Sequence, residues 1–313
     1  MKVLVLRGGP DREREVSLLS GANVAGALRA AGHEVVEADI GPGALEAIDA
    51  FDGEAVFPVL HGKWGEGGPL QEILEARGVG YVGCGPEAAR RCMDKAETKR
   101  RLERAHLPTP AWGLIGPGQR TPLEPPVVVK ALDEGSSFAM AICRTSEALR
   151  DARQRLVEHD PLLIERFIDG RELTVGVLSE NLLSEDADFT PQRVAALRAL
   201  PTLEILPAEG FYDYDAKYHR HDTRYRFDLD LPTDALDTIQ RAAVRGAEAL
   251  GVRDLGRVDV LVDADDRPWI LEINTMPGFT SHSLLPRAAA EEGVDLPKLC
   301  DRLVRRAAQR GRA

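Results

Sequence analysis

Short apolar runs alternate with helical stretches along the first 82 residues, and this rhythm constrains the fold more than any other feature of the chain. A helical pattern extends from about Arg14 to Ala31, and the apolar runs span 2–6, 34–38, 54–60 and 79–82. The alternation predicts βαβ units, with a parallel sheet, helices on its faces and ligands at the carboxyl ends of its strands. The loops after Leu6 and Leu60 are therefore expected to carry function.

The pattern changes near Met93, where a charged helix starts. Expected strands follow at 126–130, 138–143 and 161–165, with one helix between the last two. The third segment has expected strands near 171–178, 203–206, 257–262 and 268–273, a helix near 233–250 and a charged closing helix. We therefore predict an N-terminal βαβ domain, a central α+β subdomain and a C-terminal α+β subdomain, at 1–92, 93–170 and 171–313.

Lysine and arginine number 40 against 51 aspartates and glutamates, a formal net charge of −11. This excess repels phosphate backbones and anionic lipids, so general nucleic-acid and membrane-surface roles are disfavoured. No apolar run approaches the roughly 18 residues that span a membrane. The four cysteines form no C-x-x-C pair, which is typical of buried thiols in a reducing compartment. We expect a cytoplasmic protein.

A hairpin at 256–274 carries the clearest chemistry. Because side chains two apart on a strand share a face, Asp259, Glu272 and Asn274 are expected to converge. Their hard oxygens suit Mg²⁺, which leaves its other positions to water and nucleotide phosphates. Arg257 shares the face and can stabilise an anion beside the metal. The alternative is a solvated hairpin with alternating polar residues.

This hairpin is one of four stretches that resemble the D-alanine:D-alanine ligases, a family with the ATP-grasp fold. The run Glu-Ile-Asn-Thr-Met-Pro-Gly at 272–278 is similar to the closing motif of that family. Three further stretches agree in the same order, so that the resemblance covers essentially the whole chain: Gly8-Gly9 with 13–17, His61-Gly62 with Gly65-Glu66 and Gly68, and Phe-Tyr-Asp-Tyr-Asp-Ala-Lys-Tyr at 211–218.

The resemblance implies a fold and a reaction. The fold is of the α/β class, an N-terminal parallel βαβ domain followed by a two-part ATP-grasp nucleotide-binding unit, with 208–223 as a closing lid. The reaction joins two D-alanines through a D-alanyl phosphate, for peptidoglycan precursor synthesis. ATP is then the co-substrate and Mg²⁺ or Mn²⁺ the metal. A homodimer is expected, and a requirement for a monovalent cation is left open.

Nucleotide-binding roles also follow from the resemblance. Two lysines would hold the phosphates and a third the γ-phosphate, while the backbone of the strand at 162–168 would hydrogen-bond adenine and a glutamate would bind ribose. The residues concerned are Lys95, Lys130, Lys217, Glu165, Arg166, Phe167, Ile168 and Glu172. Without the resemblance, only Lys130 stands out, because it closes the apolar strand 127–129.

The first D-alanine would be bound near the N-terminal loops. Glu13 would pair with its ammonium group, although an acid at a helix N-terminus is also favoured by the macrodipole alone. His61 would assist near the carboxylate of this substrate. Ser136 would link Glu13 to Tyr218 by hydrogen bonds.

The second D-alanine would be bound near the end of the hairpin. Arg257 and the backbone N–H of Gly278 are the candidates for an oxyanion hole. Ser283 and Leu284 would bind the second carboxylate at a helix N-terminus. Ser283 could alternatively be a simple N-cap.

The chain departs from the family pattern at four places. None is assigned to phosphate or metal, so we expect altered loop packing and kinetics, and acceptor selectivity is left in doubt. They are Gly67 for an aspartate, Ala131 for a proline, Phe138-Ala139 for a small residue and glycine, and Arg226-Phe227-Asp228 for a Cys-Pro-Ala-like stretch. Residues 180–200 look like an insertion between two strands.

Other functions stay open on the sequence. The nearest is a ligase of D-alanine with D-lactate or D-serine, or of another amino acid pair. A dinucleotide-dependent oxidoreductase would fit the first βαβ unit, but the chain lacks G-x-G-x-x-G after Leu6 and the hairpin would be unexplained. A non-catalytic nucleotide-binding protein is the third possibility.

Overall fold

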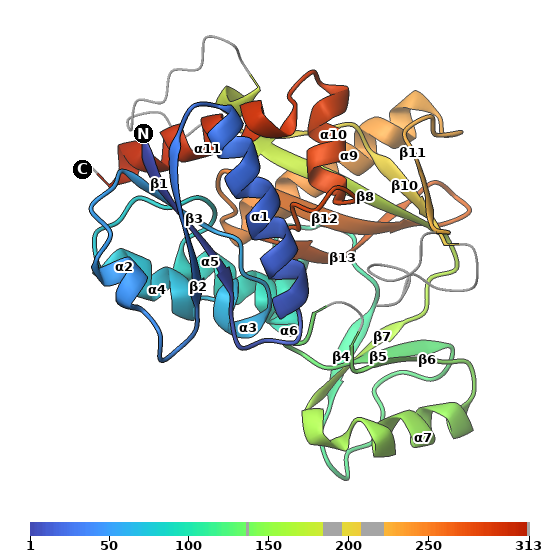
Figure 1. The fold of residues 1–313 in the computed structure, drawn as a ribbon. Coiled ribbons are helices and arrows are strands. Elements are labelled where there is room, and N and C mark those ends of the chain that lie inside the picture. Colours follow the sequence, from blue (N-terminus) through green and yellow to red (C-terminus); the bar gives the residue numbers. More distant parts are fainter. Residues whose placement is uncertain (136–137, 184–195, 208–221, 312–313) are drawn as a thin grey trace.

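The computed structural model describes residues 1–135, 138–183, 196–207 and 222–311. Three sheets follow one another along the chain (Figure 1). The strands are β1 (Lys2–Gly8), β2 (Glu34–Ile40), β3 (Ala55–Pro58), β4 (Trp112–Ile115), β5 (Val127–Lys130), β6 (Met140–Cys143), β7 (Leu162–Arg166), β8 (Arg171–Ser179), β9 (Leu197–Ala199), β10 (Leu203–Leu206), β11 (Arg224–Arg226), β12 (Leu255–Val262) and β13 (Pro268–Asn274). The helices are α1 (Arg14–Ala30), α2 (Glu46–Asp49), α3 (Gly62–Gly65), α4 (Pro69–Ala76), α5 (Pro86–Met93), α6 (Lys95–Arg104), α7 (Ser146–Arg155), α9 (Thr233–Leu250), α10 (Leu284–Glu291) and α11 (Leu296–Arg310), with short 3₁₀ turns at Val157–His159 and Glu180–Leu182.

The first sheet is parallel, in the order β2-β1-β3, as the alternating runs predict. Both of its faces are covered. Val3 and Val5 pack into the core that α1 and α11 share, while Leu4 and Leu6 pack into the core that contains the apolar residues of α4. Burial on both faces explains why the strand is a continuous apolar run.

The run at 79–82 was expected to be a strand, and that expectation is wrong. It makes one isolated parallel bridge, between Tyr81 and Val56. The chain turns away at Gly83, whose φ is +96°, and Pro86 then starts α5. Positive φ is accessible to glycine without steric cost, so the apolar run ends before a ladder can form.

The second sheet is antiparallel, in the order β4-β7-β5-β6. Helix α7 packs on β5 and β6, and the shared core includes Ile115, Val127, Val129, Leu162 and Ile164. Lys130 ends β5, so the strand carries its cation to the edge of this apolar core.

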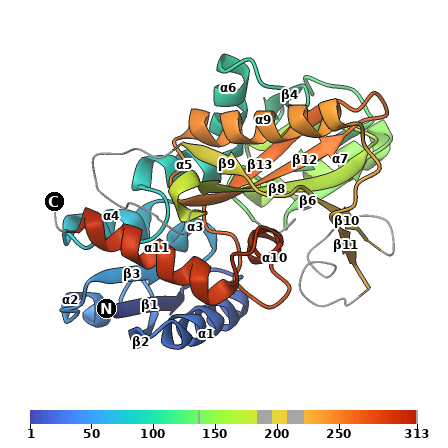
Figure 2. The same cartoon turned by 90° about the horizontal axis from the view of Figure 1, so that it is seen from above.

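The third sheet is antiparallel, with the order β11-β10-β8-β12-β13 and β9 paired with β8. Helix α9 covers one face and α10 packs on β8 (Figure 2). The register of β12 and β13 pairs Arg257 with Asn274 and Asp259 with Glu272. Directly opposed residues of an antiparallel pair lie on the same face, so the expected convergence of these side chains is observed.

Helices from one predicted domain pack against elements of another. Helix α6, from the predicted subdomain 93–170, packs on α9 and β13, and α11, from 171–313, packs on α1 and β3. The division into 1–92, 93–170 and 171–313 therefore stays a prediction. Most of the expected lid at 208–223 and of the insertion at 180–200 lies outside the described residues, namely 208–221 and 184–195.

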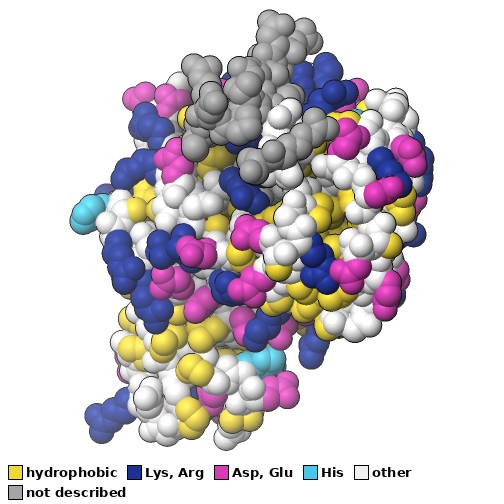
Figure 3. Space-filling model, turned by 90° about the vertical axis from the view of Figure 1, so that its left-hand side faces the viewer, with side chains coloured by type: hydrophobic (Ala, Val, Ile, Leu, Met, Phe, Trp, Pro, Cys, Tyr) yellow, Lys and Arg dark blue, Asp and Glu magenta, His cyan; other side chains and the backbone are white. Residues whose placement is uncertain are grey.

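Charges of both signs are interspersed on the face shown in Figure 3. Among the residues that the structure describes, no helix has the length and apolar character needed to cross a bilayer.

A buried ionic cluster ties the N-terminal and C-terminal layers together. Asp254 is 0% exposed and accepts hydrogen bonds from Arg306 Nε at 2.8 Å and from Arg310 Nη1 and Nη2 at 2.9 and 2.6 Å. It also accepts from the backbone N–H of Gly83 at 2.9 Å. One carboxylate therefore joins α11, the start of β12 and the loop before α5.

We predict that Asp254→Asn lowers the free energy of unfolding by about 3–5 kcal/mol, because both arginines lose the anion that compensates their burial. Asparagine fits the φ of +63° at this position, so the variant tests the charge rather than the backbone. Urea denaturation at neutral pH measures the change. Asp265→Asn is the control, since its 3.9 Å pair with Arg267 is exposed and should contribute at most about 1 kcal/mol. Equal, small losses in both variants would contradict a stabilising role for the cluster.

Candidate active site

Two cavities meet at the β12–β13 hairpin. The larger, of about 810 Å³, lies between the second and third sheets and is lined from β5, β6, β7, β8, β12 and β13. The smaller, of about 90 Å³, lies among the loops around α3, the start of α1 and the segment between β13 and α10. Glu272 lines both cavities, and a ligand group beside it would reach from one to the other.

Asp259 organises the polar face of the hairpin. Its carboxylate receives Arg257 Nε at 2.8 Å and Arg257 Nη2 at 2.7 Å, a bidentate pair. Thr174 Oγ1 donates to it at 2.6 Å and Asn274 Nδ2 at 3.2 Å. Thr174 faces Asp259 across the β8–β12 pairing. The carboxylate and the guanidinium are therefore held in place before any ligand binds.

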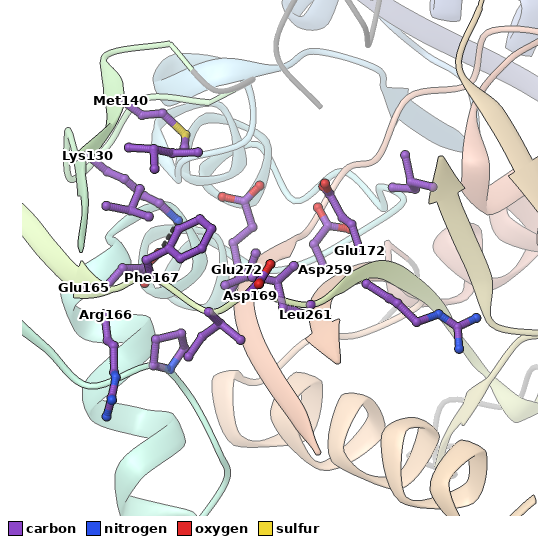
Figure 4. A pocket seen from close by; sticks show the side chains of 18 of the residues that line it. Lys130, Met140, Glu165, Arg166, Phe167, Asp169, Glu172, Asp259, Leu261 and Glu272 are labelled. Carbon is purple, nitrogen blue, oxygen red and sulfur yellow. Dashed lines mark ion pairs between the residues drawn. The ribbon is translucent and has the colours of Figure 1, made fainter. Parts of the chain in front are cut away.

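Glu272 points into the larger cavity together with Asp259 and Glu172 (Figure 4). Against the effect of burial, its negative charge acts on Lys95 and Lys130 of the same cavity to raise the pKa of each. Among the described residues, no three His, Cys, Asp or Glu side chains form a metal centre by themselves. Two carboxylates and an amide oxygen suit Mg²⁺ when a nucleotide supplies further oxygens. The donor set therefore fits the implied metal.

The wall of the larger cavity opposite the hairpin is mainly apolar. Val128, Met140, Ile142 and Phe167 line it, and the guanidinium of Arg144 lies 4.7 Å from the centre of the Phe167 ring. Such a surface suits a flat heteroaromatic group. The other nucleotide candidates that line this cavity are Lys95, Lys130, Glu165, Arg166, Ile168 and Glu172.

Two lysines of the larger cavity differ in their contacts. Lys95 Nζ donates to the backbone carbonyl of Glu134 at 2.5 Å, and burial lowers its pKa. Lys130 Nζ lies 2.5 Å from Glu165 Oε1. Burial alone would lower the pKa of Lys130, but Glu165 and Glu272 outweigh it and raise the pKa. Both ammonium groups are positioned to meet an anion.

Glu165 is buried between two lysines. Its Oε2 lies 2.6 Å from Lys99 Nζ, and the two side chains are 2% and 1% exposed. Burial opposes its charge, yet Lys130 and Lys99 hold the pKa of Glu165 at about 2. The carboxylate therefore stays charged, paired with Lys99 and Lys130 at the edge of the larger cavity.

The smaller cavity contains Glu13, His61, Arg257 and Gly278. Glu13 occupies the N-cap position of α1, yet its side chain makes no capping hydrogen bond. A Cβ on Gly135 would lie 3.0 Å from Glu13 Oε2, so the carboxylate faces the loop after β5. Glu13 therefore lies both at the helix N-terminus and in the smaller cavity, and its role in binding the substrate stays a prediction.

His61 presents a buried acceptor to the smaller cavity. Its Nδ1 lies 3.1 Å from the carbonyl oxygen of Met276, which places the proton on Nδ1. Nε2 is buried and has no hydrogen-bond partner among the described residues. Burial lowers the pKa of His61, so the neutral ring offers a lone pair at Nε2.

Glu66 is a second carboxyl beside this cavity. It accepts the backbone N–H of Gly62 at 3.2 Å and that of Met276 at 3.3 Å, joining the loop after β3 to the loop after β13. Burial raises the pKa of Glu66 to about 8, and the nearby charge of Glu13 adds to the effect. The group is therefore mostly protonated at neutral pH.

Ser283 and Leu284 line the smaller cavity at the start of α10. Ser283 occupies the N-cap position of α10, as the alternative expected, but its hydroxyl makes no capping bond to the helix and instead accepts the backbone N–H of Thr280 at 2.8 Å. A Cβ on Gly278 would lie 2.8 Å from Ser283 Oγ. A side chain at 278 would therefore disturb this corner.

Three of the candidates, Ser136, Lys217 and Tyr218, lie outside the described residues. Sequence reasoning missed Lys99, Glu66 and Thr174. Glu66 belongs to a quoted motif and Lys99 lies one turn after Lys95, so their positions gave a signal, but neither was assigned a role. Thr174 could be found only through the strand pairing that brings it to Asp259.

Comparison with known proteins is consistent across the chain. The family model described as D-ala D-ala ligase C-terminus matches residues 119–305. The D-alanine–D-alanine ligase of Bordetella parapertussis is 40% identical, and the alignment covers 98% of this chain and 95% of the relative.

Two solved structures share the whole fold. The D-alanine–D-alanine ligase of Bacillus anthracis complexed with ATP superposes with a TM-score of 0.81 at 28% identity, covering 100% of this chain and 98% of that one. The VanG D-Ala:D-Ser ligase of Enterococcus faecalis gives a TM-score of 0.80 at 27% identity, covering 98% and 99%.

We predict that the wild-type protein loses stability relative to Glu66→Gln as the pH rises from about 5 to about 8. The folded state keeps a proton on Glu66 that the unfolded state releases near its ordinary pKa of 4.5, so the free energy of unfolding falls by up to about 1 kcal/mol per pH unit in that window. Urea denaturation across this range measures the difference. Glu87→Gln, at an exposed carboxylate of α5, is the control and should follow the wild type. A constant difference between Glu66→Gln and the wild type would show that Glu66 does not hold this proton.

Proposed function

The chain belongs to the D-alanine–D-alanine ligase family, and we propose that its two cavities divide the reaction, the larger binding ATP and the smaller holding the two D-alanines. The protein joins two D-alanines to D-alanyl-D-alanine with consumption of ATP, a step of cell wall synthesis. The observation that carries the assignment of the cavities is their meeting at Glu272, on the polar face of one hairpin.

The first step is phosphoryl transfer. A carboxylate oxygen of the first D-alanine attacks the γ-phosphorus of ATP, the bond to the β,γ-bridging oxygen breaks, and ADP leaves. Such transfer depends on positioning and on neutralising charge. Lys95 and Lys130 would hold the phosphates, Glu13 the ammonium group of the amino acid, and Arg257 the transferring group.

The second step forms the peptide bond. The amine of the second D-alanine attacks the acyl carbon of D-alanyl phosphate, and inorganic phosphate leaves. Arg257 and the backbone N–H of Gly278 would stabilise the oxyanion. The start of α10 at Ser283 and Leu284 would hold the carboxylate of this substrate. The free Nε2 of His61 would accept a hydrogen bond from a substrate in the same cavity.

Asp259, Glu272 and Asn274 would hold Mg²⁺. Bound there, the ion supplies charge neutralisation to the phosphate oxygens. The protein's own contribution is to fix the two carboxylates on one face, with Arg257 locked against Asp259.

The main alternative function differs in the acceptor substrate. The match to a D-Ala:D-Ser ligase is as good in fold as the match to a D-alanine–D-alanine ligase, so selectivity must come from individual side chains. We keep D-alanine as the acceptor because relatives at 40% identity over nearly the whole chain are D-alanine–D-alanine ligases. We further propose that the protein is a homodimer in the cytoplasm. The mass of the particle in solution tests whether it is a dimer.

We predict that phosphate release from ATP requires Mg²⁺ and D-alanine together, and that D-alanyl-D-alanine is the product. Purified protein is incubated with ATP and single amino acids, phosphate is measured by a coupled assay, and the product by mass spectrometry. L-Alanine should give no turnover. Faster release with D-serine or D-lactate beside D-alanine would overturn the choice of acceptor, and release that does not depend on D-alanine would overturn the ligase assignment for these cavities.

We predict that Asp259→Ala and Glu272→Ala each lower turnover at least ~100-fold, because charge neutralisation at the transferring phosphoryl group contributes several kcal/mol. Arg257→Lys should also lower turnover, since an ammonium group cannot present two N–H groups in the fixed fork of a guanidinium. Asp265→Ala, at an exposed carboxylate in the turn beyond the cavity face, is the matched control. Near-full activity of the Asp259 and Glu272 variants would indicate a merely solvated hairpin.

A further inference from the structure

Lys99 is among the most deeply buried charged side chains of the described chain, and no step above uses it. It lies on α6 with a side chain that is 1% exposed. Its Nζ contacts Glu165 Oε2 at 2.6 Å and donates to Thr109 Oγ1 at 2.7 Å. Thr109 in turn donates to the carbonyl of Ile270 at 2.8 Å, on β13. The ammonium group is therefore enclosed by protein groups, and Lys99 does not line the larger cavity.

Lys130 shares the same carboxylate from the opposite side. It contacts Glu165 Oε1 at 2.5 Å, and its side chain is 12% exposed and lines the larger cavity. Two ammonium groups and one carboxylate leave the trio with one net positive charge. Because Lys99 is enclosed, that charge is presented to the cavity by Lys130 (Figure 4).

The net positive charge of this trio depends on Lys99. Without it, the buried carboxylate of Glu165 and the ammonium group of Lys130 would neutralise each other, and the wall that also carries Glu272 and Glu172 would become one unit more negative. A negative wall opposes a triphosphate, and the opposition is strong in a partly buried site, where charges are poorly screened.

We propose that Lys99 is a positioning residue for nucleotide binding: it neutralises Glu165 from behind, so that Lys130 keeps a net positive charge toward the phosphates of ATP. The inference rests on the proposed function of the larger cavity. It concerns a lysine that contacts neither nucleotide nor metal and acts only through Glu165.

The test separates the effect of the charge of Lys99 on ATP binding from the effect of its packing. Lys99→Met removes the buried cation, and Lys99→Arg keeps a cation beside Glu165 while it changes the packing. Arg101→Met is the matched control, because it removes one cation from the same helix, where Arg101 pairs with Glu97 at 2.8 Å away from the cavity. Isothermal titration measures the dissociation constants of Mg²⁺-ATP and of adenosine, and steady-state assays measure KM for ATP and kcat.

Lys99→Met should raise the dissociation constant and KM for ATP about 10-fold or more, with a smaller effect on kcat and no comparable effect on adenosine. Lys99→Arg should bind ATP to within about 3-fold of the wild type, although both variants lose thermal stability. Arg101→Met should bind ATP as the wild type does. If Lys99→Met does not fold, Lys99→Gln, which keeps a donor for Thr109, carries the same expectation.

Unchanged ATP affinity in the Lys99 variant would overturn the proposal. So would equal losses for ATP and adenosine, or a Lys99→Arg variant that binds ATP no better than Lys99→Met, because each indicates a packing role only. The wild-type assay with D-alanine is run first, so a failure of the ligase function is seen separately from a failure of the charge balance.

Discussion

The pairing of β12 with β13 is the constraint on which the rest of the site depends. Its register sets Arg257 opposite Asn274 and Asp259 opposite Glu272, so four polar side chains share one face. Asp259 locks Arg257 through two hydrogen bonds, which removes the need to reorganise these charges during the reaction. The cavities on either side of Glu272 are joined by this face, and a reaction between a nucleotide and an amino acid can take place across it.

Three buried titratable groups of the site have pKa values shifted in different ways, because each group has different partners. Glu165 has two lysines and stays charged, with a pKa of about 2. Glu66 has backbone N–H donors and the like charge of Glu13, and its pKa rises to about 8. His61 is buried with a carbonyl at Nδ1, and its pKa falls. One site therefore holds a permanent anion, a protonated carboxyl and a neutral imidazole at the same pH.

The fold was predictable from the sequence where periodicity is strong. The range expected for the helix at 233–250 matches α9, and the alternation of apolar residues in the hairpin predicted which side chains share a face. The run at 79–82 does not form the expected strand, because its apolar residues are buried without continuous pairing in a sheet. The roles of Lys99 and Glu66 depend on tertiary contacts: α6 has a charged sequence typical of a solvated helix, and only its packing on α9 and β13 buries Lys99. Glu66 meets Met276 across 210 residues of chain, a distance that no local pattern reports.

The central claim is that the polar face of the hairpin joins a nucleotide cavity to an amino acid cavity through a bound metal. The most direct measurement is the anomalous scattering of Mn²⁺ in crystals grown with ADP and a non-reactive phosphinate analogue of D-alanyl phosphate. The account predicts a peak bounded by Asp259, Glu272 and Asn274, with the nucleotide on one side and the analogue beside Glu13 and His61 on the other. A peak remote from the hairpin, or an analogue bound outside the smaller cavity, would contradict it.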